Sequence, residues 1–168
     1  MKADLFFLFL SDTFGLYIIS FSLYKHKLKT KYKIMSYLKF DKTLMTNLEE
    51  SLPREILRTN RSGAYHCTTI ADCNTRKYHG LLVIPVPELD DENHVLLSSL
   101  DETVIQHGAE FNLGLHKYQG DNYSPNGHKY IREFECEKVP TTIYRVGGVV
   151  LKKEKLFVHH ENRILIRY

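Results

Sequence analysis

Hydrophobic and polar residues alternate in short stretches along most of the chain after residue 53. Segments rich in β-branched and aromatic residues are separated by glycine, proline or polar turns, a pattern that predicts strands. The predicted strands cover residues 56–60, 64–70, 79–86, 94–108, 130–139, 141–146, 149–160 and 163–168. Short strands joined by turns at this spacing predict an all-β fold, specifically an antiparallel β-sandwich.

One helix and two tight connections interrupt this strand pattern. A short helix is predicted at Leu44–Leu52, because Pro53 cannot continue it. The pair Gly147-Gly148 separates two strand segments as a hairpin turn would. A second turn is predicted at residues 161–163, between the last two strands.

The last strands indicate a sheet that continues beyond the sequence. Residues 131–136 alternate in type, so Ile131, Glu133 and Glu135 are expected on one face and the residues between them on the other. The sequence stops at Tyr168 within a strand pattern, and an edge strand that ends there leaves a sheet unfinished. We therefore expect residues 35–168 to form an incomplete β-sandwich domain of a longer protein.

The first 34 residues differ from the rest. Residues 5–24, LFFLFLSDTFGLYIISFSLY, are long enough to span a membrane, and the lysines that follow could mark a cytoplasmic flank. Asp12 would lie at mid-span, however, and the absence of a cleavage site disfavours secretion. Composition changes sharply at Met35, and translated AT-rich noncoding DNA would give the same mixture. We interpret residues 1–34 as a mis-assigned start, with a membrane anchor as the alternative.

Net charge argues against a nucleic-acid partner. The chain carries +3 overall, but residues 1–34 account for +4 through six lysines against Asp4 and Asp12, which leaves −1 for residues 35–168. Phosphate backbones are bound by a basic surface on the folded part, so no nucleic-acid binding is expected. The composition, 43% hydrophobic and 26% charged, is that of an ordinary globular protein.

The three cysteines indicate a reducing compartment. Cys67, Cys73 and Cys136 form neither a CxxC pair nor an even set for disulfides, so a cytoplasmic location is expected. A zinc site built from Cys67 and Cys73 with His66 and His79 would not have a common ligand spacing. We therefore expect no metal and no cofactor.

The stretch NTRKYHGLL, residues 74–82, places a cluster of polar side chains against an apolar run. If the strand begins near Arg76, Arg76 and Tyr78 point to one side and His79 to the other. Asn74, Arg76, Tyr78 and His79 combine hydrogen-bonding groups with flat apolar faces, which suits a polyhydroxylated ligand. The alternative is that these side chains only satisfy loop carbonyls and pack against a neighbouring strand.

A family resemblance rests on this region. The stretch EILRTNRSGAYHCTTIADCNTRKYHGLLVIPVP, followed by VLLSSLDETV, resembles the N-terminal domain of bacterial and archaeal glycogen debranching enzymes of the amylo-α-1,6-glucosidase type. The matching positions are Glu55, Thr59, Asn60, Gly63, Tyr65, Thr69, Asn74, Thr75, Arg76, Tyr78, His79, Gly80, Leu81, Leu82, Leu100, Asp101 and Glu102. The resemblance runs from about Met35 to Tyr168. Arg61 and Ala64 stand where the family commonly has glycine, so a tight turn there is expected to differ.

The resemblance implies a fold, a partner and a substrate. Such enzymes continue into an (α/α)6 barrel that carries the catalytic carboxylates. This chain would then be a supersandwich-like domain that packs on that barrel, in cis or in trans, and helps to shape its site for an α-glucan such as glycogen or a branched oligosaccharide. The implied substrate-binding positions are Asn60, Asn74, Arg76, Tyr78, His79, Asp101 and Glu102. The alternative function is a stand-alone carbohydrate-binding or scaffolding module.

The carboxylates of this chain do not predict catalysis. Glycoside hydrolysis uses two carboxyl groups on either side of the scissile bond, about 5 to 9.5 Å apart. Asp101 and Glu102 are adjacent, so in an extended chain they point to opposite faces. Glu133 and Glu135 share a face of a highly charged strand and are expected to face solvent. No nucleophile elbow, phosphate-binding loop or HExxH motif occurs. We therefore expect no catalytic residues and no glucosidase activity from the chain alone.

Overall fold

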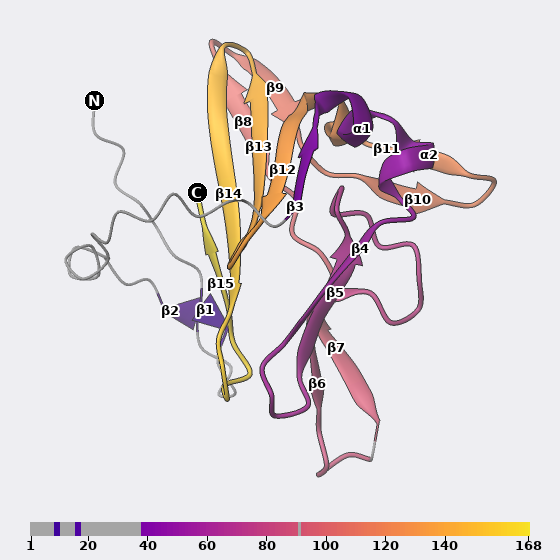
Figure 1. Cartoon of the computed structure of the whole chain (residues 1–168), viewed down its shortest axis with the longest axis vertical. Helices are drawn as coiled ribbons and strands as arrows, with labels where there is room; N and C mark the ends of the chain where they lie inside the picture. Colours follow the sequence, from indigo (N-terminus) through magenta and orange to yellow (C-terminus); the bar gives the residue numbers. More distant parts are fainter. Residues whose placement is uncertain (1–8, 11–15, 18–37, 91) are drawn as a thin grey trace.

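The computed structural model of the protein describes residues 9–10, 16–17, 38–90 and 92–168. Two antiparallel sheets make up its body, as Figure 1 shows, and the predicted all-β sandwich is confirmed. The larger sheet has the order β15-β14-β13-β12-β3 and the smaller one the order β4-β5-β6-β7. The predicted membrane anchor falls almost wholly outside the described residues, and within these residues no helix is long and apolar enough to cross a membrane.

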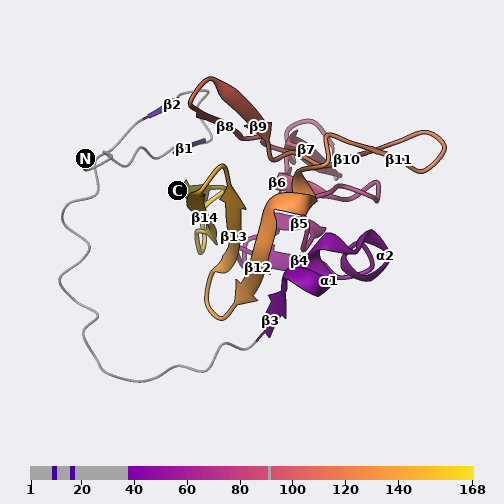
Figure 2. The same cartoon turned by 90° about the horizontal axis from the view of Figure 1, so that it is seen from above.

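The elements of the two sheets come from separate parts of the chain. The larger sheet contains β3 (Leu38–Asp41), β12 (Ile131–Cys136), β13 (Pro140–Val146), β14 (Val149–Phe157) and β15 (Ile164–Arg167). The smaller contains β4 (Glu55–Thr59), β5 (Tyr65–Thr69), β6 (Gly80–Pro85) and β7 (Asn93–Leu97). Three further two-stranded pairs are formed by β1 (Phe9–Leu10) with β2 (Leu16–Tyr17), β8 (Thr103–Gln106) with β9 (Ala109–Asn112), and β10 (His116–Tyr118) with β11 (Asn122–Ser124). Both views show the β10–β11 hairpin projecting from the body (Figures 1 and 2).

The predicted helix is present as two short helices. These are α1 (Lys42–Thr46) and α2 (Leu48–Ser51), and a 3-10 helix lies at Gly127–Tyr130. The break occurs at Asn47, whose backbone is extended with ψ 110° and whose side chain accepts a hydrogen bond from the Glu49 amide at 3.0 Å. An asparagine that caps a new helix in this way ends the previous one, because its side chain replaces the missing backbone partner.

The glycine hairpin is confirmed, and the alternation predicted for residues 131–136 holds from Glu133 to Cys136 but fails at Ile131. Val146 pairs with Val149 across Gly147 and Gly148, whose φ angles of 55° and 84° suit a tight hairpin turn. In β12, Ile131 and Phe134 are both buried. A β-bulge between Ile131 and Glu133 shifts the register by one residue, which moves the buried face from odd to even positions.

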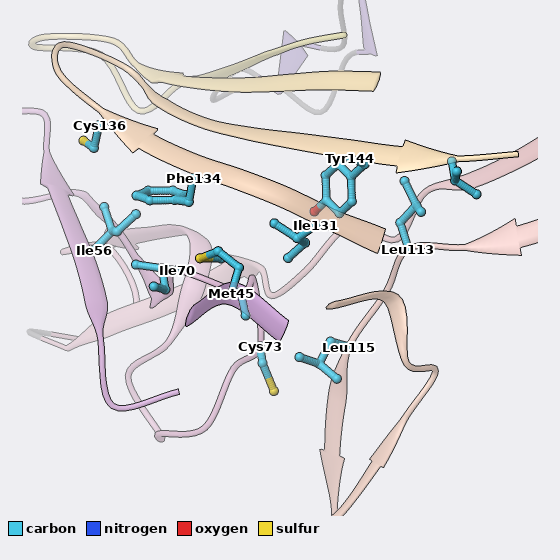
Figure 3. Packing of buried hydrophobic residues seen from close by; sticks show 12 residues of the cluster. Met45, Ile56, Ile70, Cys73, Leu113, Leu115, Ile131, Phe134, Cys136 and Tyr144 are labelled. Carbon is cyan, nitrogen blue, oxygen red and sulfur yellow. The ribbon is translucent and has the colours of Figure 1, made fainter. Parts of the chain in front are cut away.

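Two apolar clusters fill the interior. The larger one contains Met45, Ile56, Ile70, Ala71, Cys73, Leu113, Leu115, Ile131, Phe134, Cys136, Tyr144 and Val146. Figure 3 shows Met45 of α1 packed among residues of this cluster from the strands and loops around it. The smaller cluster contains Ala64, Leu81, Leu82, Ile84, Phe157, Ile164 and Ile166, and therefore joins β6 to β14 and β15.

Two lysines separate these clusters along β14. Leu151 packs against the larger cluster and Phe157 belongs to the smaller one. Lys153 and Lys155 lie between them on the same face of the strand, and they are 2% and 1% exposed. A strand that buries two lysines between apolar residues requires acidic partners from the opposite layer, because an isolated buried charge is strongly unfavourable.

The turn between β4 and β5 adopts the conformation that a glycine would favour. Arg61 has a φ of 68°, in the left-handed region, and Gly63 follows with a φ of 97°. Arginine has no side-chain hydrogen bond of the kind that lets asparagine or aspartate tolerate this region, so the position stores backbone strain. The turn was expected to differ from the family pattern because Arg61 stands where glycine is common. The difference lies in the arginine side chain and the backbone strain, whereas the backbone keeps the conformation that glycine would adopt.

We predict that Arg61→Gly stabilises the fold by about 0.5 to 1 kcal/mol, because relief of a left-handed L-residue outweighs the extra chain entropy of glycine. Chemical denaturation of the 168-residue chain measures this difference. The matched control is Arg145→Gly on β13, where the residue is exposed and the backbone is that of a strand. The control is expected to lose about 0.5 to 1 kcal/mol. Destabilisation by both substitutions would contradict the strain at position 61.

Candidate functional site

The polar motif of residues 74–79 forms a turn, and β6 begins only at Gly80. The His79 amide donates to the Arg76 carbonyl at 3.1 Å, which closes the turn. The interpretation that a strand begins near Arg76, with alternate side chains on opposite faces, is therefore wrong. A turn lets consecutive side chains converge, and three of them meet at one carboxylate.

That carboxylate belongs to Glu55, at the start of the neighbouring strand β4. Arg76 Nε donates to Glu55 Oε1, and the Tyr78 hydroxyl donates to Oε2 at 3.3 Å. His79 Nε2 lies 3.3 Å from Oε1. Burial raises the pKa of Glu55, but the hydrogen bond and charge of Arg76 outweigh this, so the net pKa is lowered and the group is ionised at neutral pH. We call Glu55, Arg76, Tyr78 and His79 the Glu55 cluster.

His79 supports this cluster from inside the protein. Its side chain is fully buried, and its Nδ1 accepts a hydrogen bond from the Thr75 amide at 3.0 Å. An imidazole that accepts at Nδ1 carries its proton on Nε2, which is the nitrogen directed at Glu55. Burial lowers the pKa of His79 despite the carboxylate, which favours the neutral ring. His79 therefore holds the turn in place through Nδ1 and packs beside Glu55 without a hydrogen bond to it, and it does not itself reach solvent.

Glu55 and His79, together with Cys67, have the spacing of a metal site, but the protonation of His79 does not suit one. Ligand atoms of Glu55, Cys67 and His79 lie within 4.8 Å of one another. Metal ligation through Nε2 needs a lone pair there, and the hydrogen bond accepted at Nδ1 fixes the proton on Nε2 instead. The guanidinium of Arg76 already neutralises Glu55. In the part of the chain that the structure describes, His66 and Cys73 do not join this group.

Two members of the Glu55 cluster face solvent. The side chain of Arg76 is 55% exposed, and Tyr78 is 47% exposed. The tyrosine ring packs edge-on against the His79 ring, with centroids 5.2 Å apart. A fixed carboxylate, a guanidinium and an aromatic face thus lie together on the surface, where they can donate to, accept from and stack on a ligand.

The two asparagines expected at the site both hold loops together. Asn74 accepts from the Thr68 hydroxyl at 2.9 Å and donates to the Ser98 carbonyl at 2.8 Å, so it ties the turn to β5 and to the chain after β7. Beside it lies a cavity of about 10 Å³, lined partly by Asn74 and Asp72, which has room for about one water and none for a sugar.

Asn60 is fully buried and joins two turns. Its Oδ1 accepts from the Ser62 and Ala64 amides at 2.7 and 3.1 Å, and its Nδ2 donates to the Glu161 carbonyl at 3.1 Å. The β4–β5 turn is thereby fixed to the β14–β15 turn. Asn60 thus has a structural role that its residue type alone does not reveal.

The adjacent acids Asp101 and Glu102 point to different partners, as the sequence predicts. Asp101 Oδ2 lies 2.6 Å from His116 Nε2, whereas Glu102 Oε1 lies 2.8 Å from Lys153 Nζ. Glu133 and Glu135 form cross-strand ion pairs, with Lys39 at 2.7 Å and with Lys152 at 3.8 Å. Each of these carboxylates therefore has a basic partner within ion-pair distance.

A buried charge network, which the sequence interpretation missed, surrounds Lys153 and Lys155. Lys153 Nζ lies 3.2 Å from Asp72 Oδ2 and 2.8 Å from Glu102, and Lys155 forms an ion pair with Asp72 Oδ1. The Tyr168 hydroxyl donates to Glu102. The available signal was the spacing of Lys153, Lys155 and Phe157, which places two lysines on the buried face of a strand. Two lysines and two acids make the network neutral, which is the condition for its burial.

The pKa shifts follow from this mutual neutralisation. Burial raises the pKa of Asp72, but the charges of Lys155 and Lys153 outweigh it and the net pKa is well below its ordinary value. Burial lowers the pKa of Lys153, yet Asp72 and Glu102 raise it overall. For Lys155, burial dominates over Asp72 and the pKa is lowered. Asp72 is therefore ionised at neutral pH and holds the two lysines together.

His66 adjoins this network as a neutral residue. Its side chain is buried, and its Nδ1 donates to the Gly80 carbonyl at 3.2 Å. Burial and the charge of Lys155 lower the pKa of His66 to about 3. Protonating this ring would place a third positive charge beside two buried lysines, so the folded protein excludes the proton.

The fold and site define an all-β domain whose candidate site is a polar surface cluster on a turn, supported by buried polar residues. A family model described as glycogen debranching enzyme N terminal matches residues 54–168, and the chain therefore belongs to that family. The resemblance drawn from the motif around residues 74–82 is confirmed, although the matched region begins at residue 54 and not at Met35. Searches of the curated proteins and of the solved structures find no match.

We predict that the fold loses about 2 kcal/mol of stability between pH 7 and pH 5 through His66 alone. The unfolded chain binds a proton near pH 6.5 and the folded chain only near pH 3, so stability is lost as pH falls through this window, at about 1.4 kcal/mol per unit. Denaturation at the two pH values measures the loss. The asparagine amide of His66→Asn can keep the hydrogen bond to the Gly80 carbonyl. In this variant we therefore expect the loss of stability between pH 7 and pH 5 to be smaller by about 2 kcal/mol. An unchanged pH dependence in the variant would refute the assignment to His66.

Proposed function

We propose that the chain is the non-catalytic N-terminal portion of a glycogen-debranching α-1,6-glucosidase. It would pack on an (α/α)6 catalytic domain, present in cis or in trans, and contribute the Glu55 cluster to the surface that holds the α-glucan. The observation that carries this proposal is the convergence of Arg76, Tyr78 and His79 on Glu55 within the region that matches the family.

The chemistry of the cluster suits a glucan. A carboxylate accepts hydrogen bonds from sugar hydroxyls, and a guanidinium donates to hydroxyl and ring oxygens. The exposed ring of Tyr78 offers an apolar face to the C–H face of a glucose unit. Because the hydrogen bonds from Arg76 and Tyr78 orient Glu55, the site is ordered before it meets a ligand, which lowers the entropic cost of binding.

The carboxylates support a non-catalytic role for this portion. Hydrolysis requires an acid and a base or nucleophile that flank one bond. Glu55 is ionised beside Arg76, and Asp101, Glu102, Glu133 and Glu135 each pair with a basic side chain. The acid and the base would come from the catalytic domain. We also propose a cytoplasmic location, since Cys67, Cys73 and Cys136 are buried free thiols that suit a reducing compartment.

Substitution of the two exposed members of the cluster tests the proposal. We expect Arg76→Ala to weaken the binding of a branched maltooligosaccharide by about tenfold or more, and Tyr78→Ala by about fivefold, because a charge-assisted hydrogen bond and an aromatic contact are lost. Calorimetric titration of the 168-residue chain, alone and together with the catalytic domain, measures this binding. Both variants are expected to keep the parent's melting temperature, since both side chains are half exposed.

Two controls separate binding from stability. Lys77→Ala removes an exposed charge from the same turn without touching Glu55 and is expected to leave affinity unchanged. His79→Ala removes a buried support, so we expect a loss of stability of about 1 to 3 kcal/mol together with weaker binding. Unchanged glucan affinity in both Arg76→Ala and Tyr78→Ala would overturn the site and leave the motif with a structural role only.

A further inference from the structure

A second candidate site lies away from the Glu55 cluster, between the two sheets. A cavity of about 340 Å³ is lined by Leu57, Arg58, Thr59, Arg61, Lys138, Pro140, Lys155, Leu156, Phe157 and His159. These residues come from β4 and the turn after it, from β14 and the chain that follows, and from the β12–β13 connection and the first residue of β13. The volume falls within the range typical of pockets for small organic ligands.

The ionisable side chains that line this cavity are all basic, and we call it the basic cavity. It contains two arginines, two lysines and a histidine but no acidic residue. Lys155 is neutralised by Asp72, whereas the ion pairs of the described residues do not involve Arg58, Arg61 or Lys138. The acidic residues that neighbour the lining residues in sequence do not themselves line the cavity. One of these, Glu161, forms an ion pair with Arg163 at 3.2 Å. Positive charge is therefore concentrated here in a domain whose residues 35–168 sum to −1.

The hydrogen bonding of Arg58 is a further indication that the basic cavity binds an anion. Its terminal NH2 group donates to the Cys136 sulfur at 2.6 Å, which is a weak acceptor for a guanidinium. Its Nε is buried and has no acceptor among the described residues. The guanidinium of Arg58, which lines the basic cavity, therefore has no charged acceptor among the described residues, and an anion beside it would supply one.

Arg61 adds a second, independent observation. Its backbone has a φ of 68°, a conformation that favours glycine, and Asn60 holds the turn rigidly in place. The strained turn thus presents a guanidinium at the cavity where a glycine would be more stable. Strained backbone retained beside a cavity is typical of a position that serves a ligand.

We propose that this cavity binds a phosphate monoester of a small organic molecule. Arg58, Arg61 and Lys138 would hold the phosphate, since guanidinium groups match its oxygens in pairs and an ammonium adds a point charge. Thr59 offers a hydroxyl, and Phe157 offers an apolar surface to the organic part. The site is separate from the Glu55 cluster and does not depend on the function proposed for it.

The test is a titration of the 168-residue chain at low ionic strength with three probes. These are glucose 6-phosphate, inorganic phosphate and glucose. We expect glucose 6-phosphate to bind, inorganic phosphate to bind about tenfold or more weakly, and glucose to give no signal. Absence of binding by both phosphates would overturn the site. Equal affinity for the two phosphates would overturn the assignment of an esterified ligand.

Two variants locate the binding. Lys138→Glu, at an exposed turn position, and Arg61→Gly are each expected to weaken binding of glucose 6-phosphate by about tenfold. Arg61→Gly is also expected to melt at a higher temperature, so its weaker binding could not come from unfolding. The matched control Lys129→Glu makes the same charge change at an exposed position outside the cavity and is expected to bind as the parent does.

The outcomes separate the two candidate sites. Arg76→Ala and Tyr78→Ala are expected to leave binding of glucose 6-phosphate unchanged. If Lys138→Glu and Arg61→Gly bind the phosphate ester as tightly as the parent, the basic cavity is not its site. If the Glu55-cluster variants lose it instead, the phosphate binds at the surface proposed for the glucan.

Discussion

The structure depends on one buried set of charges. Asp72, from the loop after β5, pairs with Lys153 and Lys155 of β14, and Glu102 completes the balance. These contacts join the smaller sheet to the larger one at the point where the two apolar clusters are interrupted. Because a buried lysine without a counterion is strongly unfavourable, the sheets can pack only in an arrangement that brings Asp72 to β14. The network therefore fixes how one sheet sits on the other.

This arrangement also positions both candidate sites. The residues between Asp72 and β6 form the turn that carries Arg76, Tyr78 and His79, so its starting point is held by the network. Lys155 also lines the basic cavity, where its charge is neutralised by Asp72. Asn60 then ties the β4–β5 turn to the β14–β15 turn and fixes the opposite wall. Each site thus combines exposed residues on a turn, Arg76 and Tyr78 or Arg61, with residues that β4 or the protein interior holds in place.

Much of the fold could be predicted from the sequence, because its signals are local. Period-two alternation and the Gly147-Gly148 turn predicted the strands and a hairpin, and the motif of residues 74–82 identified the family. The bulge in β12 could not be predicted, since it depends on pairing with β13 rather than on residue type. The turn at residues 76–79 was mistaken for a strand because it lies directly against an apolar run. Glu55 and Arg76 are 21 residues apart, and Asp72 and Lys155 are 83 residues apart, so only the tertiary structure brings each pair together.

The role of Asp72 is tested most directly by the free energy of unfolding of Asp72→Asn in the 168-residue chain. Asparagine keeps the shape of the side chain and tolerates the φ of 59° at this position, so the substitution removes the charge alone. We predict a loss of about 3 to 5 kcal/mol, because two buried lysines lose their shared counterion, and a partial recovery when Lys155→Met is added. A loss below about 1 kcal/mol, the value of a surface ion pair, would contradict it.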